Sequence, residues 1–239
     1  MKLKLLHIVD MQNDFMLADG KLSVAGAESL IKPANEFLKT VKFDMTIATF
    51  DTHYAETYDK TEESKMFPPH CLYGTRGWEL AVQPLNGWLN LYEKVLKNQF
   101  NVWEHPERIE KSLSVFKPVD TEVYIMGVAS DFCVKYAIIG YLQRGYHVTV
   151  VQDLCRGINK QIDEVAQDLN NPNIKLTTSD QVYNKQNKPT RKPIIYPDFS
   201  KMDPNDPLIK ALEKRRPYSS SDFVPKYMIP DLRDKQYGN

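Results

Sequence analysis

The stretch EVYIMGVASDFCVKYAIIGYLQRGYHVTVVQD, residues 122–153, predicts the fold class. Residues 122–129 form a short continuous apolar run, which is typical of a strand buried on both faces of a sheet. Residues 131–146 have the spacing of an amphipathic helix that ends near Gly145, and residues 147–153 return to a β-branched strand pattern. This order predicts two parallel strands joined by a crossover helix.

The same alternation continues on both sides of this unit. Further strand patterns occupy residues 3–9, 45–50, 89–96 and 173–178, and helical spacing occupies residues 28–41, 108–116 and 160–169. Near-continuous apolar strands that alternate with helices are typical of a parallel sheet covered on both faces. We therefore predict an α/β, Rossmann-like fold with three layers (α/β/α) around a mainly parallel six-stranded sheet.

The C-terminal segment differs in composition from the rest of the chain. Residues 189–239 hold eight of the fifteen prolines, interspersed with aromatic and aliphatic side chains such as Tyr196 and Phe223. We predict one domain over residues 1–185 and an irregular Pro-rich extension over residues 186–239. Because the extension carries these apolar anchors, we expect it to pack on the domain or on a neighbouring subunit of a homo-oligomer.

The overall composition excludes several classes of partner. The 239 residues include 31 basic and 31 acidic side chains, so no net charge indicates binding to nucleic acid or to an anionic membrane. The apolar run in the first ten residues is too short for a signal peptide or a membrane span. Three cysteines without C-x-x-C spacing indicate neither a disulfide framework nor a structural zinc site. We expect a cytoplasmic protein.

Reactive side chains follow several of the predicted strands. Asp10 follows the first strand, Lys97 the third, and Cys133 opens the helix after the fourth. Since ligands of open parallel sheets bind beyond the carboxyl ends of the strands, these side chains are candidates for a shared site. A helix N-terminus favours a thiolate at Cys133, whereas the alternative is a packed cysteine. Asp10 could instead cap a turn, and Lys94 is not excluded by spacing as an alternative to Lys97.

The segment that follows the second strand carries candidate metal ligands. Asp51 and His53 lie two residues apart, so both side chains project from one face of an extended segment. His70 follows after a polar loop that Pro68 and Pro69 restrict. Two histidines and a carboxylate suit a metal site with open positions, and the alternative is three separate surface residues. Carboxylates that could add to the set are Glu56, Asp59, Glu62 and Glu63.

Four separated motifs resemble the isochorismatase-like cysteine hydrolases, and the metal segment resembles the nicotinamidase branch. The motifs are VDMQNDF (9–15), FDTH (50–53) with FPPHC (67–71), LKNQF (96–100) and GVASDFCV (127–134). The match covers residues 3–178 and does not extend into the Pro-rich extension. It implies that Asp10, Lys97 and Cys133 are general base, orienting cation and nucleophile.

The resemblance also implies that Asp51, His53 and His70 bind one divalent metal ion, with Zn favoured and Fe or Mn as alternatives. Many nicotinamidases carry another histidine shortly after the D-x-H pair, and here that stretch reads YAETYD (54–59). Others in the branch use a glutamate seven residues before the last histidine, where this chain has Glu63. We therefore expect Glu63 as the fourth ligand, with Glu62 and Glu56 as alternatives.

The substrate side of the site follows from the same resemblance. It implies a cis peptide bond between Val128 and Ala129, and an oxyanion hole formed by the amides of Ala129 and Cys133. Candidates to sandwich a flat aromatic ring are Phe15, Phe67 and Phe132, although each is also compatible with an ordinary core position.

The expected function is a metal-dependent cysteine amidohydrolase of NAD salvage. It converts nicotinamide, a small aromatic carboxamide, to nicotinate and ammonia through a thioester. One alternative on the same scaffold acts on another small amide, a carbamoyl group or an ether. A second alternative is a catalytically silent binding module, but such relatives usually lose the cysteine, the aspartate or the lysine, and this chain retains all three.

Overall fold

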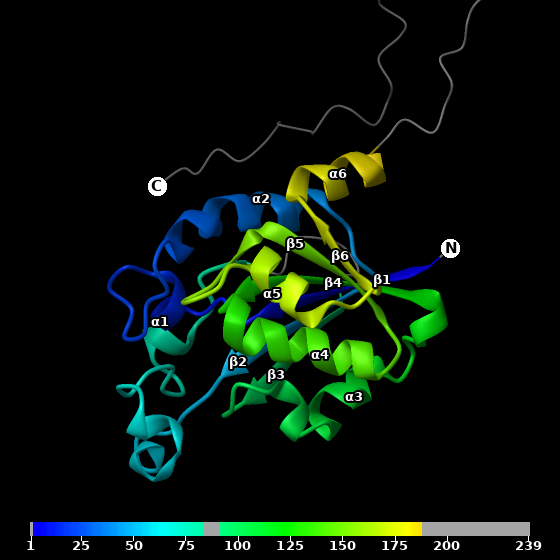
Figure 1. Ribbon diagram of the computed structural model, residues 1–239. Helices are drawn as coiled ribbons and strands as arrows, with labels where there is room; N and C mark the ends of the chain where they lie inside the picture. Colours follow the sequence, from blue (N-terminus) through cyan, green and yellow to red (C-terminus); the bar gives the residue numbers. More distant parts are fainter. Residues whose placement is uncertain (1, 84–90, 188–239) are drawn as a thin grey trace, which may run out of the picture. The chain divides into compact units, whose positions relative to one another are not determined.

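The computed structural model describes residues 2–83 and 91–187 and shows one six-stranded, all-parallel sheet (Figure 1). The strand order is β3-β2-β1-β4-β5-β6. The strands are β1 (Leu3–Val9), β2 (Met45–Asp51), β3 (Leu91–Lys97), β4 (Thr121–Val128), β5 (His147–Arg156) and β6 (Ile174–Thr177). The predicted three-layer α/β fold is confirmed.

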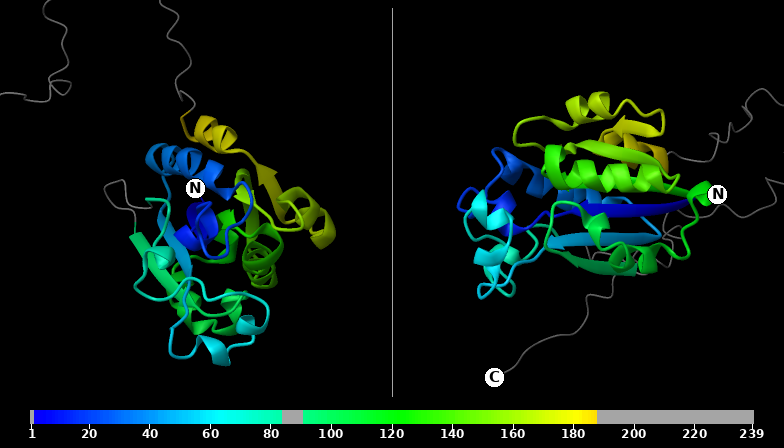
Figure 2. Two further views of the ribbon diagram at one scale, coloured as in Figure 1. Left: turned by 90° about the vertical axis from the view of Figure 1, so that its left-hand side faces the viewer. Right: turned by 60° about the horizontal axis from the view of Figure 1, so that its bottom comes forward.

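Helices cover both faces of the sheet (Figure 2). One face carries α2 (Ile31–Thr40) and α6 (Ser179–Asn187), and the other carries α3 (Glu107–Leu113), α4 (Lys135–Gln143) and α5 (Ile162–Leu169). The four-residue helix α1 (Asn13–Met16) follows β1. Short 3-10 turns are η1 (Ala27–Leu30), η2 (Tyr58–Lys60), η3 (Glu63–Lys65), η4 (Arg76–Trp78), η5 (Val102–Glu104) and η6 (Pro118–Asp120), and η7 (Ser130–Val134) is a π-turn.

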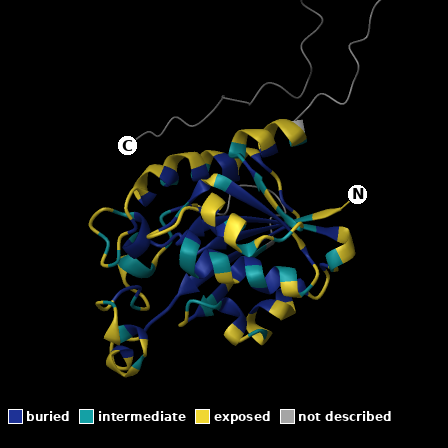
Figure 3. Cartoon of the chain, viewed as in Figure 1, coloured by how far each residue is buried: buried dark blue, intermediate teal, exposed yellow. Residues whose placement is uncertain are grey.

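The strands are apolar because both of their faces are buried. In β1, Leu6 and Ile8 pack beneath α2, whereas Leu5 and Val9 pack beneath α3 and α4. The alternation of side chains along a strand divides these residues between the two layers. Figure 3 shows the result: the central part of the sheet is buried, and exposed residues lie on the outer sides of the helices, in the loops and at strand ends.

The segment that was predicted as one helix over residues 131–146 has two parts. Residues Ser130–Val134 form η7, in which Phe132 departs from helical geometry (φ −122°, ψ −107°), and α4 begins only at Lys135. Cys133 therefore precedes α4. The sequence interpretation had placed Cys133 in the first turn of this helix. Apolar spacing alone cannot show this difference, because Phe132 and Cys133 are apolar in either case. In the structure both side chains line a cavity.

Other boundaries shift less. The helix expected over 108–116 ends at Leu113, and the polar helix α6 was not predicted because it has little apolar spacing. Residues 89 and 90 of the third expected strand lie outside the described residues, as does the Pro-rich extension from residue 188, so its packing stays a prediction. Within the described part of the chain, no helix combines the length and apolar character needed to span a membrane.

The parallel arrangement places the carboxyl ends of all strands at one edge of the sheet. At that edge lie α1 and the long connection that follows β2, drawn in cyan in Figure 1. The side chains that the sequence singled out as reactive belong to this edge.

Candidate active site and metal centre

The carboxyl ends of β1, β3 and β4 lie at one edge of the sheet and bring Asp10, Lys97 and Cys133 together. Asp10 follows β1, Lys97 ends β3, and Cys133 lies in η7 beyond β4. The Lys97 Nζ atom lies 2.7 Å from Asp10 Oδ2 and 3.6 Å from Cys133 Sγ. All three are buried, with exposed fractions of 0%, 4% and 7% for Asp10, Lys97 and Cys133. The arrangement fits a nucleophile, a base and a cation in mutual contact.

Lys94, the alternative to Lys97, lies elsewhere. Its Nζ atom lies over the rings of Phe50 and Trp78, 4.5 and 4.6 Å from their centroids, and the side chain is exposed. Successive residues of a strand face opposite sides, so Lys94 and Lys97, three apart, point to different faces of the sheet. The geometry therefore selects Lys97.

Lys97 stays charged in spite of its burial. Burial by itself lowers the pKa of the ammonium, but the nearby Asp10, Cys133 and Asp51 outweigh it and raise the pKa well above its usual value. An unpaired buried charge would be strongly unfavourable, and the contact with Asp10 compensates both groups.

Cys133 rests as a thiol. Burial raises its pKa well above the usual value; Lys97 opposes the shift, whereas Asp10 and Asp51 add to it. The raised pKa indicates that the position ahead of α4 does not outweigh the effect of burial on this thiol. A carboxylate that can take the thiol proton is required beside the sulfur.

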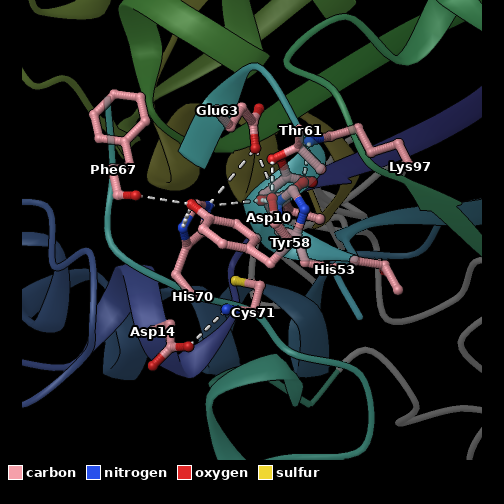
Figure 4. Close-up of polar contacts among 12 residues, drawn as sticks. Asp10, Asp14, His53, Tyr58, Thr61, Glu63, Phe67, His70, Cys71 and Lys97 are labelled. Atoms are coloured by element: carbon pink, nitrogen blue, oxygen red, sulfur yellow. Dashed lines mark hydrogen bonds and ion pairs between the residues drawn. The ribbon is translucent and has the colours of Figure 1, made fainter. Parts of the chain in front are cut away.

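Three side chains from the loop after β2, His53, Glu63 and His70, converge on one point (Figure 4), and Asp51 at the end of β2 completes the group. Asp51, His53, Glu63 and His70 each offer a ligand atom, and these atoms lie within 4.8 Å of one another. Asp51 Oδ2 lies 3.1 Å from Nε2 of both histidines, and Glu63 Oε2 lies 2.9 Å from His53 Nε2. The predicted ligand set is thus brought together.

The structure distinguishes Glu63 from its two alternatives. Glu63 is 6% exposed, whereas Glu56 is exposed and Glu62 forms a surface ion pair with Lys65. Only the side chain of Glu63, among these three glutamates, belongs to the cluster.

The hydrogen bonds around the cluster fit a divalent cation. His70 Nδ1 lies 2.8 Å from the carbonyl oxygen of Pro68, which only accepts, so Nδ1 carries a hydrogen. His70 Nε2 faces the carboxylate of Asp51. A cation held between these donor atoms would have mixed nitrogen and oxygen ligands, and the buried Oε1 of Glu63 has no hydrogen-bond donor. Two imidazole nitrogens and two carboxylates suit Zn, Fe or Mn.

Burial and neighbouring charges shift the pKa values of Asp51 and His53. Burial raises the pKa of Asp51, but Lys97 and the hydrogen bonds from both histidines outweigh this and lower it. Burial lowers the pKa of His53, but Asp51 and Glu63 outweigh it and raise the pKa to about 9. A proton and a cation compete for the same ring nitrogen. The second oxygen of Asp51 lies 3.6 Å from Lys97 Nζ, so the cluster adjoins the triad.

A small apolar cavity lies beside Cys133. The predicted residues Phe15, Phe67 and Phe132 all line it. Its volume of about 30 Å³ admits one or two water molecules, so a six-membered ring requires side chains of the wall to move. Other lining residues, which sequence reasoning missed, are Leu22, Val24, Phe100, Val128 and Ile158. A larger open cavity of about 460 Å³ contacts Lys97 and His53 from the side of β3, but Cys133 does not line it.

The peptide bond between Val128 and Ala129 is cis, as predicted. Ala129 and Cys133 both line the apolar cavity.

Sequence reasoning also missed residues that hold the ligands in place. Gln12 donates from Nε2 to the carbonyl oxygens of Asp51 (2.8 Å) and Trp78 (2.9 Å), and accepts the Asp51 N–H (2.7 Å). Asp14 accepts the N–H of Cys71, the residue after His70, at 2.7 Å. Both lie in the VDMQNDF motif, and their polarity within a segment flanked by apolar residues was the available signal.

Comparison with known proteins supports this geometry. The chain matches the Isochorismatase domain over residues 4–181. It is 29% identical to the nicotinamidase of Saccharomyces cerevisiae over 73% of this chain and 99% of that one. It is 30% identical to the nicotinamidase of Escherichia coli over 67% of this chain and 86% of that one.

Solved structures share the fold. PnC1 from L. infantum in complex with nicotinate aligns with a TM-score of 0.61 and 23% identity, covering 75% of this chain and 94% of that one. The pyrazinamidase of Pyrococcus horikoshii in complex with zinc aligns with a TM-score of 0.58 and 24% identity, covering 73% and 98%. The motifs, the sheet order and these matches lead to one conclusion: the chain belongs to the isochorismatase family, within its nicotinamidase branch.

Proposed function

We propose that this protein hydrolyses nicotinamide to nicotinate and ammonia and that a divalent metal ion assists it. The observation that carries the proposal is the position of the apolar cavity, which is lined by Cys133 of the triad and by Asp51 and His70 of the metal cluster. A flat ring in this cavity would have its carboxamide near the thiol and its ring edge near the cluster. Membership of the family makes the protein a hydrolase of amide bonds.

The chemistry starts from a neutral thiol. Asp10 accepts the proton of Cys133, and the thiolate attacks the carboxamide carbon. The amides of Ala129 and Cys133 stabilise the resulting oxyanion. Asp10 returns the proton to the leaving nitrogen, so that ammonia departs and a thioester remains. Water, deprotonated by Asp10, then adds to the thioester, releases nicotinate and restores the thiol. Lys97 keeps Asp10 ionised and oriented at 2.7 Å.

The metal ligands are Asp51, His53, Glu63 and His70, and their mixed nitrogen and oxygen donors favour Zn, with Fe or Mn as alternatives. When bound there, the cation supplies a Lewis-acid position for the pyridine nitrogen of the substrate. The residues themselves fix the edge of the cavity: Phe15 packs against the His70 ring at 5.5 Å, so ring binding and ligand geometry share one wall.

The lining of the cavity favours a neutral amide over the dianionic ether substrate of isochorismate-type relatives. No lysine or arginine lines the cavity among the residues that the structure describes, so two carboxylates would be desolvated there without a compensating charge. A catalytically silent binding module is a weaker candidate. Buried groups with strongly shifted pKa values, such as the Cys133 thiol, are typical of catalytic sites.

Ammonia release from nicotinamide by metal-replete protein tests the proposal. We expect turnover of nicotinamide and none of isochorismate, and loss of turnover when Cys133 is replaced by alanine. No ammonia release from nicotinamide by metal-replete protein would contradict the proposal, and turnover by Cys133→Ala would contradict the assigned nucleophile.

A further inference from the structure

We propose that Asp131 is a positioning residue that fixes the rim of the substrate cavity by holding residues 157–160 against the turn that carries the nucleophile. The inference rests on the proposed amide hydrolysis for its kinetic consequences. Its geometric content concerns Cys133 and Ile158 and can be measured without substrate.

The Asp131 carboxylate accepts three consecutive backbone N–H groups from a loop far away in the sequence. Oδ1 accepts from Ile158 at 2.9 Å, and Oδ2 accepts from Asn159 at 2.8 Å and from Lys160 at 3.2 Å. Burial raises the pKa of Asp131, but these backbone donors outweigh it and lower the pKa. Hydrogen bonds to an ionised acceptor are stronger than neutral ones, so the carboxylate ties the two segments together beyond the end of the β4–β5 ladder.

The two segments that Asp131 joins both line the same cavity. Asp131 lies in η7, immediately before Phe132 and two residues before Cys133, and both of these side chains line the cavity. Ile158 lines the cavity from the loop and is 50% exposed, which places it at the rim. One carboxylate therefore sets the distance between the rim and the nucleophile.

The loop of residues 157–160 turns sharply between β5 and α5. It follows β5, which ends at Arg156, and precedes α5, whose N-terminus Gln161 and Glu164 cap reciprocally. A Cβ atom at Gly157 would collide with the carbonyl oxygen of Lys160, so the chain turns sharply here. The ends are fixed by a strand and a helix, and the Asp131 contacts fix the middle, where Ile158 lies.

The cavity must enlarge when a ring enters, because its present volume is about 30 Å³. With the backbone of residues 158–160 held, enlargement is confined to side chains, and Ile158 keeps contact with the bound ring. Without Asp131, the rim backbone moves away, the ring loses that contact, and solvent reaches Cys133. Asp10 and Lys97 lie on other elements and keep their contact.

The test compares Asp131→Ala with Asp153→Ala. Asp153 is a matched control, because its carboxylate accepts the N–H (2.8 Å) and the hydroxyl (2.5 Å) of Ser179 across a similar distance in sequence but does not line the cavity. We expect Asp131→Ala to raise KM for nicotinamide about tenfold with a smaller change in kcat. A tenfold change in KM corresponds to the loss of about one hydrogen bond to a charged group. Asp153→Ala should leave KM unchanged.

A double-mutant cycle separates positioning from general destabilisation. If Asp131 acts through Ile158, the variant with both Asp131→Ala and Ile158→Ala should have a KM no higher than the larger single-variant value. Multiplying effects would contradict the inference. If Asp131→Ala does not fold, Asp131→Asn retains the shape with weaker acceptors and should show the same pattern with a smaller rise in KM.

Iodoacetamide alkylation of Cys133, followed by peptide mapping, provides the readout that needs no substrate. We expect several-fold faster alkylation in Asp131→Ala and an unchanged rate in Asp153→Ala. Equal alkylation rates in the two variants would overturn the inference, even if nicotinamide turns out not to be the substrate. Absence of nicotinamide turnover together with faster alkylation in Asp131→Ala would overturn the proposed function and support the positioning role.

Discussion

The triad and the metal cluster lie side by side but are built in different ways. Asp10 follows β1 and Lys97 ends the edge strand β3, and both strands pair with β2 between them, so the ladder sets their separation. His53, Glu63 and His70 belong to a connection with only short 3-10 turns. Strand pairing positions Asp10 and Lys97, whereas loop contacts position His53, Glu63 and His70.

The loop contacts are specific. The N–H of His53 donates to the carbonyl oxygen of Cys71 at 3.1 Å, and the hydroxyl of Tyr58 reaches the carbonyl oxygens of Phe67 and Pro68 at 3.0 and 2.9 Å. Local stability varies across a structure with such differences in contact density. We therefore expect the triad to keep its geometry under perturbations that disorder the metal ligands. The following predictions test this difference.

The largest effect is expected at the nucleophile. Cys133→Ala should lower kcat for the amide by on the order of 10⁴-fold or more, because no other group can form the thioester. Thermal unfolding should change little, since the substitution removes one sulfur from a cavity wall. Steady-state ammonia release and calorimetry provide the two measurements, and a loss below a hundredfold would contradict the role.

Lys97→Met tests the triad as a structural unit. It leaves the carboxylate of Asp10, which is 0% exposed, without its cation, so we expect about 3–5 kcal/mol of lost unfolding free energy in addition to lost activity. Lys94→Met is the control, because Lys94 is exposed. Denaturant titration measures both variants, and equal stabilities would show that Asp10 does not depend on Lys97.

Removal of the metal tests the other half of the comparison. A chelator should lower the unfolding free energy by about 2.7 kcal/mol relative to protein at a metal concentration one hundred times the dissociation constant. Hydrogen exchange should accelerate in residues 53–70 and remain slow in β1, β2 and β4. Acceleration throughout the sheet would contradict the separation of the two regions.

The glutamate assignment belongs to the same test. Glu63→Ala should lose metal on dialysis, as measured by elemental analysis, whereas Glu62→Ala and Glu56→Ala should retain it. Retention by Glu63→Ala would assign the fourth position to another group.

The smallest effect is expected at Tyr58. Tyr58→Phe removes the hydroxyl that reaches the carbonyl oxygen of Pro68, the same oxygen that orients His70, and should cost about 0.5–1.5 kcal/mol. Metal affinity should fall with it, as is usual when a group behind a ligand is lost. Tyr54→Phe, at a residue that is 50% exposed, is the control, and equal metal affinities in the two variants would contradict the effect.

Much of the fold and of the candidate site could be predicted because the signals are local. Continuous apolar strands and alternating helices predict the three-layer sheet, and the parallel topology places the residues that follow each strand at one edge. The motifs around Asp10, Asp51, Lys97 and Cys133 then indicate the family. Glu63 was expected from the resemblance, and the structure places its side chain in the cluster.

Other features depend on contacts between distant segments. Nothing local marks Ile158 as a cavity residue, since it is a single apolar residue in a loop that the fold brings to the cavity beside Cys133. Phe100 and Leu22 also line this cavity, although they belong to segments far apart in the sequence. Apolar spacing likewise could not show that η7 interrupts the expected helix at Phe132.

The amino-acid sequence by itself determined the fold class, the family and the identity of the reactive side chains, because those depend on periodicity and on motif spacing. Tertiary structure alone decided the direction in which the pKa of Cys133 is shifted, the size of the cavity and the contacts of residues such as Gln12 and Asp131. These depend on burial and on the distances between groups that are tens of residues apart, and it is burial beside Asp10, rather than the position of Cys133 ahead of a helix, that keeps its thiol protonated.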